Sequence, residues 1–157
     1  MRQATNCFLI DENGKVLLAM KKRGFGVGKW NGVGGKVQEG ERPDETAARE
    51  VKEEIGVTVK TDDLVKVAEI DYSNEDPNWG MFVHVFIAKE WKGKPEESEE
   101  MKPEWFDEED ISFGEAWPDL VHWLPRILAG EKLKANFLYK ADGELLESFD
   151  VKQIEGF

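Results

Sequence analysis

Cysteine is nearly absent from this chain, and basic residues are scarce relative to acidic ones. One cysteine, Cys7, occurs in 157 residues, so no internal disulfide can form and we expect a reducing compartment, the cytoplasm. Lysine and arginine total 21 against 33 aspartate and glutamate residues, which gives a net charge of −12. A field of that sign repels phosphate backbones and argues against nucleic acid as a partner. It leaves open a small phosphorylated molecule that is held through a cation.

Long hydrophobic runs are also missing. No apolar stretch approaches the roughly 18 residues that a spanning helix needs, so we expect no membrane partner. The start, MRQATNCFLI, is too short and too polar for a secretory signal. The composition, 40% hydrophobic and 11% aromatic, is that of a globular protein. We therefore expect one domain over residues 1–157, acting as a monomer.

Strand patterns outnumber helical ones. Strands are expected at 3–10 and 15–22, joined as a hairpin by the turn DENG, then at 57–61, 64–73 and 80–91, with a closing hairpin over 135–151. The mostly apolar run VHVFIA predicts that its strand is central. One helix is predicted from Pro43 to Ile55, with Gly56 as its stop. A second is predicted over 117–130, opened by Pro118 and distorted at Pro125. This pattern indicates an α+β fold, a mixed β-sheet sandwiched between helices.

The stretch AAREVKEEIG collects acidic side chains on one part of the first helix. Glu50, Glu53 and Glu54 fall within about 100° of one another on a helical wheel. Like charges four residues apart repel by a few tenths of a kcal/mol, which a cation between them would relieve. Ligands that are all oxygen suit Mg²⁺, with Mn²⁺ as an alternative, and not zinc. The competing interpretation is a plain solvated helix face.

The spacing of these acids extends into a longer motif. Gly35 is followed by five residues, Glu41, seven residues and then REVKEEIGV, residues 49–57. This agrees at every specified position with G-x5-E-x7-R-E-U-x-E-E-x-G-U, so the sequence resembles the Nudix hydrolase family. The resemblance implies a Nudix fold and a loop–helix–loop that binds divalent cations. It also implies cleavage of a nucleoside diphosphate linked to another group.

The resemblance assigns roles residue by residue. It implies a catalytic set of Arg49, Glu50, Glu53 and Glu54, in which Glu53 is either a ligand or the general base. It implies that Glu41 pairs within the motif and that Lys36 meets phosphate. The metal ligands that it implies are the Gly34 carbonyl, Glu50, Glu53, Glu54 and, from the acidic segment EESEEM, Glu100.

Three further segments, MKKRGFGVGKWNGVGGKVQEGE, MKPEWF and AWPD, resemble the MutT-type members of that family, which hydrolyse oxidised purine nucleoside triphosphates. The resemblance implies conversion of 8-oxo-dGTP to 8-oxo-dGMP and pyrophosphate, which sanitises the nucleotide pool. In the base pocket that it implies, Asn31 and Asp119 hydrogen-bond the purine and Trp117 stacks on it. The full set of implied substrate-binding residues is Thr5, Lys21, Phe25, Asn31, Tyr72, Met81, Trp117, Asp119 and Trp123.

Most of these pocket residues have a structural alternative. Trp117 and Trp123 flank a helix start and are also typical of a core or a hydrophobic staple. Met81 also suits sheet packing and Asn31 a turn. Asp119 is favourable in a first helical turn for dipole reasons alone.

The chain departs from the animal enzymes of this type where they carry two adjacent acids, because Leu120 follows Asp119 here. Two neighbouring carboxylates share a proton and meet either a guanine-like or an adenine-like edge. We therefore predict a preference for 8-oxo-dGTP over 2-oxo-dATP. Phe82 in place of an acid, and Asn74 in place of an aromatic residue, leave the base preference open. The alternatives are hydrolysis of dinucleoside polyphosphates, nucleotide sugars or methylated purine triphosphates, or a catalytically silent nucleotide sensor, against which the complete motif argues.

Overall fold

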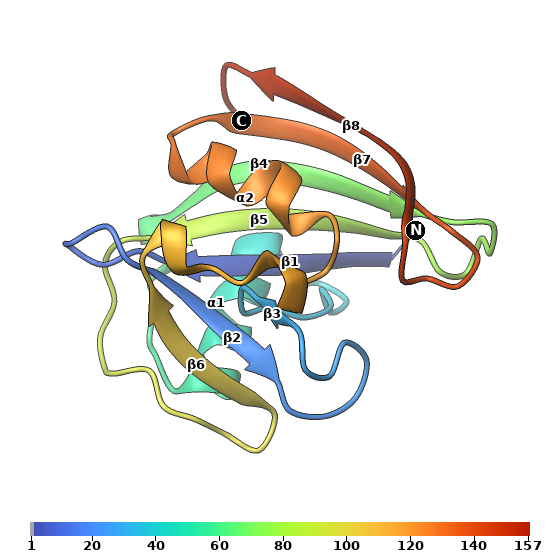
Figure 1. Cartoon of the computed structure of the whole chain (residues 1–157). Coiled ribbons are helices and arrows are strands. Elements are labelled where there is room, and N and C mark those ends of the chain that lie inside the picture. Colours follow the sequence, from blue (N-terminus) through green and yellow to red (C-terminus); the bar gives the residue numbers. More distant parts are fainter. Residues whose placement is uncertain (1) are drawn as a thin grey trace.

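The computed structural model describes residues 2–157, which form two β-sheets with helices on their faces (Figure 1). The elements in chain order are β1 (Arg2–Leu9), β2 (Val16–Lys21), β3 (Trp30–Asn31), α1 (Pro43–Ile55), η1 (Thr61–Asp63), β4 (Leu64–Ser73), β5 (Met81–Ala88), β6 (Met101–Phe106), η2 (Glu108–Asp110), η3 (Phe113–Glu115), α2 (Leu120–Leu128), β7 (Lys132–Tyr139) and β8 (Leu146–Ile154). The larger sheet has the order β1-β5-β4-β7-β8 and mixes parallel with antiparallel pairs, and the smaller has the order β3-β2-β6.

The helices agree with local sequence signals. The prediction for α1 is confirmed at both ends, because Pro43 occupies its first turn and Gly56 ends it in the left-handed conformation with φ 75°. Helix α2 is shorter than predicted: it begins at Leu120, two residues after Pro118, and includes Pro125. No helix within residues 2–157 is long and apolar enough to cross a membrane.

Two strand predictions were wrong because pairing depends on distant segments. The expected hairpin of 3–10 with 15–22 does not form: β1 pairs in parallel with β5, and β2 pairs with β3 and β6. A single bridge, Ile10 to Val16, joins the two segments. The segment predicted as a strand at 57–61 forms one bridge, at Thr58. Its buried valines alternate as they would in a strand, but no partner strand within residues 2–157 lies beside them. The central position of β5 and the closing hairpin of β7 with β8 are confirmed.

The alternating side chains of β1 separate two hydrophobic clusters. Cys7 and Leu9 point toward α1, where they pack with its buried stripe. Phe8 belongs to the cluster of α2, with its ring 5.8 Å from that of Trp123. Figure 1 shows the two helices on opposite sides of the larger sheet. The predicted sandwich of a mixed sheet between helices is therefore confirmed.

Candidate active site

The glycine-rich segment before α1 lies along the free edge of β1. The Thr5 amide donates to the Gly35 carbonyl at 2.9 Å, and Cys7 and Val33 exchange two backbone hydrogen bonds. A Cβ built on Gly34 would lie 1.8 Å from the Thr5 carbonyl oxygen, and one on Gly35 only 2.5 Å from the Glu50 carboxyl carbon. Because Gly34 and Gly35 have no side chains, their backbone fits between β1 and the acidic residues of α1.

Arg49 holds the acidic residues of the motif in place. Its Nε donates to Glu41 at 2.7 Å, and its Nη1 donates to Glu50 at 2.7 Å and to Glu53 at 3.2 Å. Its Nη2 reaches the Lys36 carbonyl at 3.3 Å, which ties α1 to the glycine segment. The hydrogen bonds from Arg49 lower the pKa of Glu41 to about 2. Glu41 and Arg49 thus form a permanently ionised pair beneath the site.

Glu54 occupies an unusual environment for a carboxylate. Its Oε2 is buried and has no hydrogen-bond partner within residues 2–157. Burial, with the neighbouring carboxylates of Glu50 and Glu100, raises the pKa of Glu54 to about 8. An unpartnered buried oxygen facing two other acids is a position that a divalent cation would satisfy.

The predicted metal ligands are not all drawn to one point. Of the residues that the structure describes, no three acidic, histidine or cysteine side chains are grouped ready to hold a metal. Glu53 is 58% exposed and turned to Arg49. Glu100 pairs with Arg23 at 3.3 Å while still acting electrostatically on Glu54. Glu50, which packs against Gly35, and Glu54 form the pair that best fits a cation.

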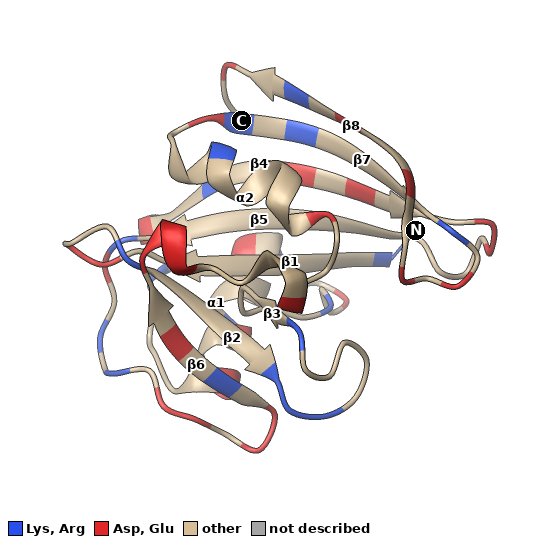
Figure 2. Ribbon diagram, viewed as in Figure 1, with Lys and Arg blue, Asp and Glu red and all other residues tan. Residues whose placement is uncertain are grey.

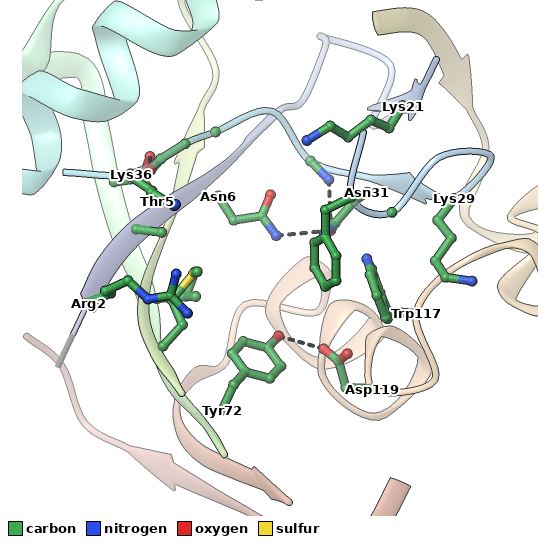
Figure 3. Close-up of a pocket in the computed structure, with 18 of the residues that line it drawn as sticks. Arg2, Thr5, Asn6, Lys21, Lys29, Asn31, Lys36, Tyr72, Trp117 and Asp119 are labelled. Carbon is green, nitrogen blue, oxygen red and sulfur yellow. Dashed lines mark hydrogen bonds between the residues drawn. The ribbon is translucent and has the colours of Figure 1, made fainter. Parts of the chain in front are cut away.

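A cavity of about 580 Å³ opens beside the glycine segment that precedes α1 (Figure 3). Eight of the nine predicted substrate-binding residues line it: Thr5, Lys21, Phe25, Asn31, Tyr72, Met81, Trp117 and Asp119. Trp123 does not, because it is buried in the core of α2, from where its Nε1 donates to Asp119 at 2.7 Å. Gly34 and Gly35 also line the cavity, so its far end adjoins Glu50.

The cavity is basic although the protein is acidic. Arg2, Lys21, Lys29 and Lys36 line it, and among the lining residues that the structure describes Asp119 is the one acid. Figure 2 shows basic residues at the end of β2 and along the loop that follows, while acidic residues are distributed over the rest of the chain. An anionic ligand is therefore attracted to this cavity despite the net charge of −12.

Aromatic rings form the opposite end of the cavity. Phe25 is 72% exposed and its ring lies 5.2 Å from that of Trp117, over which the Lys29 ammonium also sits at 5.0 Å. Asp119 is 3% exposed and accepts hydrogen bonds from Tyr72 at 2.6 Å, from Trp123 and from the Tyr139 hydroxyl. Such a wall, apolar with a few placed polar groups, suits a planar base.

Several lining residues were not predicted from the sequence. Trp79 lies in the loop between β4 and β5 and Tyr139 at the end of β7, and no local sequence pattern marks either residue. Asn6 is a polar residue inside the buried strand β1, and that contrast was a signal that a buried amide needs a partner. Its partner is Asn31, at 2.9 Å.

Comparisons with known proteins agree with this geometry. The model of the NUDIX domain matches residues 1–127. The oxidized purine nucleoside triphosphate hydrolase of Mus musculus is 43% identical over 91% of this chain and 90% of its own length, and that of Danio rerio is 43% identical over 88% of each. The crystal structure of a MutT protein from Bacillus halodurans superposes with a TM-score of 0.81 and 28% identity, covering 97% of this chain and 98% of that one. The motif, the fold and these matches together show that this chain belongs to the Nudix family.

Proposed function

We propose that this chain hydrolyses oxidised purine nucleoside triphosphates, converting 8-oxo-dGTP to 8-oxo-dGMP and pyrophosphate and so sanitising the nucleotide pool. The observation that carries the proposal is one continuous cavity. It has aromatic rings and Asp119 at one end, lysines along its wall, and Gly34–Gly35 against the acids of α1 at the other. The relatives in mouse and zebrafish are named oxidized purine nucleoside triphosphate hydrolases.

The acidic end supports divalent-metal hydrolysis. We assign Glu50 and Glu54 to hold Mg²⁺, with Mn²⁺ as an alternative, and Gly34, Glu53 and Glu100 as further ligands. When bound, the ion neutralises phosphate oxygens and lowers the pKa of a coordinated water. Arg49 keeps Glu50 directed toward the glycine segment through its 2.7 Å hydrogen bond. Lys21 and Lys36, both in the cavity wall, are placed to bind phosphate oxygens.

The aromatic end supports a purine. Trp117 and Phe25 provide faces on which a base stacks, worth about 1–3 kcal/mol for each ring. Asn31 and Asp119 lie in the same wall and provide the hydrogen bonds that distinguish one base from another. Thr5, Tyr72 and Met81 complete the wall, and Trp123 acts through Asp119. We propose a single domain over residues 1–157 that works as a cytoplasmic monomer on a small-molecule substrate.

Pyrophosphate release tests the proposal. We expect turnover of 8-oxo-dGTP above that of dGTP, 2-oxo-dATP and ADP-ribose with Mg²⁺, and none with EDTA. Glu54→Gln should lower kcat by about a hundredfold or more, since it removes a charged ligand while keeping the side-chain shape. Glu147→Gln, at an exposed position of β8, is the matched control and should leave kcat unchanged.

Two results would contradict the proposal. Turnover that survives EDTA and Glu54→Gln would remove the metal site from the reaction. ADP-ribose hydrolysis faster than that of every triphosphate would move the chain to another Nudix activity.

A further inference from the structure

The side chain of Asn31 is held in one orientation by its neighbours. The Gly32 backbone amide lies 2.9 Å from one terminal atom of Asn31, and because a backbone N–H only donates, that atom must be the oxygen, Oδ1. The Nδ2 of Asn6 donates to the same Oδ1 at 2.9 Å. The two lone pairs of Oδ1 are therefore both used. What Asn31 offers to the cavity is its pair of N–H donors.

Asn6 is itself confined. It is 7% exposed within β1, and a Cβ on Gly32 would lie 2.2 Å from its Oδ1, so the amide is packed closely against the glycine segment. Figure 3 shows Asn6 turned to Asn31, with the hydrogen bond between them at the edge of the cavity. Turning Asn31 over would place two amide nitrogens against each other and against the Gly32 N–H.

Asp119 is held with the opposite polarity. Its Oδ2 accepts from the Tyr72 hydroxyl at 2.6 Å and from the Trp123 indole at 2.7 Å, and its Oδ1 accepts from the Tyr139 hydroxyl. A carboxylate has about four acceptor positions, so three are taken by the protein and one is left. All three partners donate, which leaves Asp119 an acceptor for a ligand and not a donor. Leu120, the next residue, is 1% exposed in the core and supplies no second acid.

We infer that Asn6, Tyr72 and Tyr139 are positioning residues that determine base specificity, holding the cavity in a donor-plus-acceptor pattern that selects 6-oxopurines over 6-aminopurines. This inference rests on the proposed function and narrows its substrate class. A 6-oxopurine edge presents an acceptor, O6, beside N–H donors at N1 and N2, which complement Asn31 and Asp119. A 6-aminopurine edge presents an amino donor at C6 beside an acceptor at N1. In the same position, the amino group of a 6-aminopurine would face the N–H donors of Asn31, and its N1 acceptor would face the Asp119 carboxylate. These buried polar groups would then be left without hydrogen-bond partners.

A pair of product nucleotides isolates this effect from catalysis. The dissociation constants of 8-oxo-dGMP and 8-oxo-dAMP, measured by isothermal titration calorimetry without metal, compare two bases with the same oxidation and opposite edges. We expect the wild-type protein to favour 8-oxo-dGMP by about tenfold or more. Asn6→Leu removes one of the two donors that hold Asn31 Oδ1 and leaves Gly32 as its partner, which loosens the amide, and Tyr72→Phe or Tyr139→Phe frees an acceptor position and lets the carboxylate rotate. Each should lower the ratio of the two constants by about fivefold.

The ratio separates positioning from general structural damage. A variant that only loosens the fold weakens both nucleotides alike and leaves the ratio unchanged, and that result in all three variants would overturn the inference. Asn136→Leu, at an exposed position of β7, is the matched control and should keep the wild-type ratio. If Asn6→Leu does not fold, Asn6→Asp keeps the size of the side chain. Its carboxylate would repel Asn31 Oδ1 instead of donating to it, weaken the orientation that Gly32 supports and lower the same ratio.

Failure of the inference and failure of the proposed function give different results. Equal affinity for the two nucleotides in the wild-type protein, or binding of neither, would overturn the inference. Selective binding of 8-oxo-dGMP without pyrophosphate release from 8-oxo-dGTP would overturn the proposed hydrolysis and support the inference.

Discussion

Replacing Gly35 by alanine tests whether the contact between the glycine segment and Glu50 serves the reaction. The new Cβ would lie 2.5 Å from the Glu50 carboxyl carbon, whereas ordinary contact begins at 3.4 Å, so one group must shift by about 0.9 Å. Gly35 is held by its hydrogen bond from Thr5, so the carboxylate of Glu50 is the group that moves. Gly35 is not among the glycines with positive φ, and the effect is therefore one of contact rather than of backbone strain.

The magnitude follows from that displacement. A misplacement of about 1 Å in a reacting site costs on the order of a hundredfold in rate, and overpacking destabilises by about 1–3 kcal/mol. We expect Gly35→Ala to fold, to lower kcat/KM for 8-oxo-dGTP by about a hundredfold, and to need more Mg²⁺ for half-maximal rate. Initial rates of pyrophosphate release against Mg²⁺ concentration, with urea unfolding, measure both effects.

A matched glycine supplies the control. A Cβ on Gly114 would meet nothing within 4 Å, so Gly114→Ala should leave rate and stability near those of the wild type. If folded Gly35→Ala keeps its rate within about twofold, a 0.9 Å shift of Glu50 does not matter, and the reasoning that places the metal at Glu50 is refuted.

Three further perturbations probe other parts of the fold. Burial and the nearby Lys66 lower the pKa of His84 below 6.5, so the neutral imidazole makes its full contribution to the free energy of unfolding above pH 6.5. That contribution is lost as the pH falls through the lowered pKa. Urea titrations should show this loss in the wild type and not in His84→Gln. Burial raises the pKa of Cys7 to about 12, so the thiol should react with Ellman's reagent only after unfolding; prompt reaction of the native protein would contradict its burial. Arg49→Lys keeps the charge but loses the paired hydrogen bonds from Nε and Nη2 to the Glu41 carboxylate. It should lower the free energy of unfolding in urea by about 1–3 kcal/mol and lower kcat. Unchanged values would show that the paired hydrogen bonds are dispensable.

The predictions that succeeded depend on short-range geometry. A helix repeats every 3.6 residues, so the sequence alone was enough to bound α1 by Pro43 and Gly56 and to place Glu50 and Glu54 on adjoining turns. A helical wheel does not show that Glu53 turns to Arg49 and away from Glu50 and Glu54, because the direction of a side chain depends on which partners lie within reach. A helical wheel was likewise unable to show that Trp123 is buried behind the cavity, where its indole donates to Asp119.

Strand pairing lay beyond the sequence for a related reason. The turn DENG and the apolar runs on either side of it are compatible with a hairpin, and equally compatible with two strands that belong to separate sheets. The choice was made by β5 and β6, which lie far along the chain and pair with every residue of β1 and β2.

The family motif, the acidic helix and the residue types of a nucleotide site are all readable from the amino-acid sequence, because each depends on a few helical turns or on a fixed spacing. How those side chains are oriented depends on contacts that form only in the folded protein. Asn6 meets Asn31 across 25 residues, and Tyr72 and Tyr139 meet Asp119 across 47 and 20. Whether a cavity side chain offers a donor or an acceptor depends on which groups folding brings within about 3 Å of it. Residue spacing along the chain does not predict those contacts.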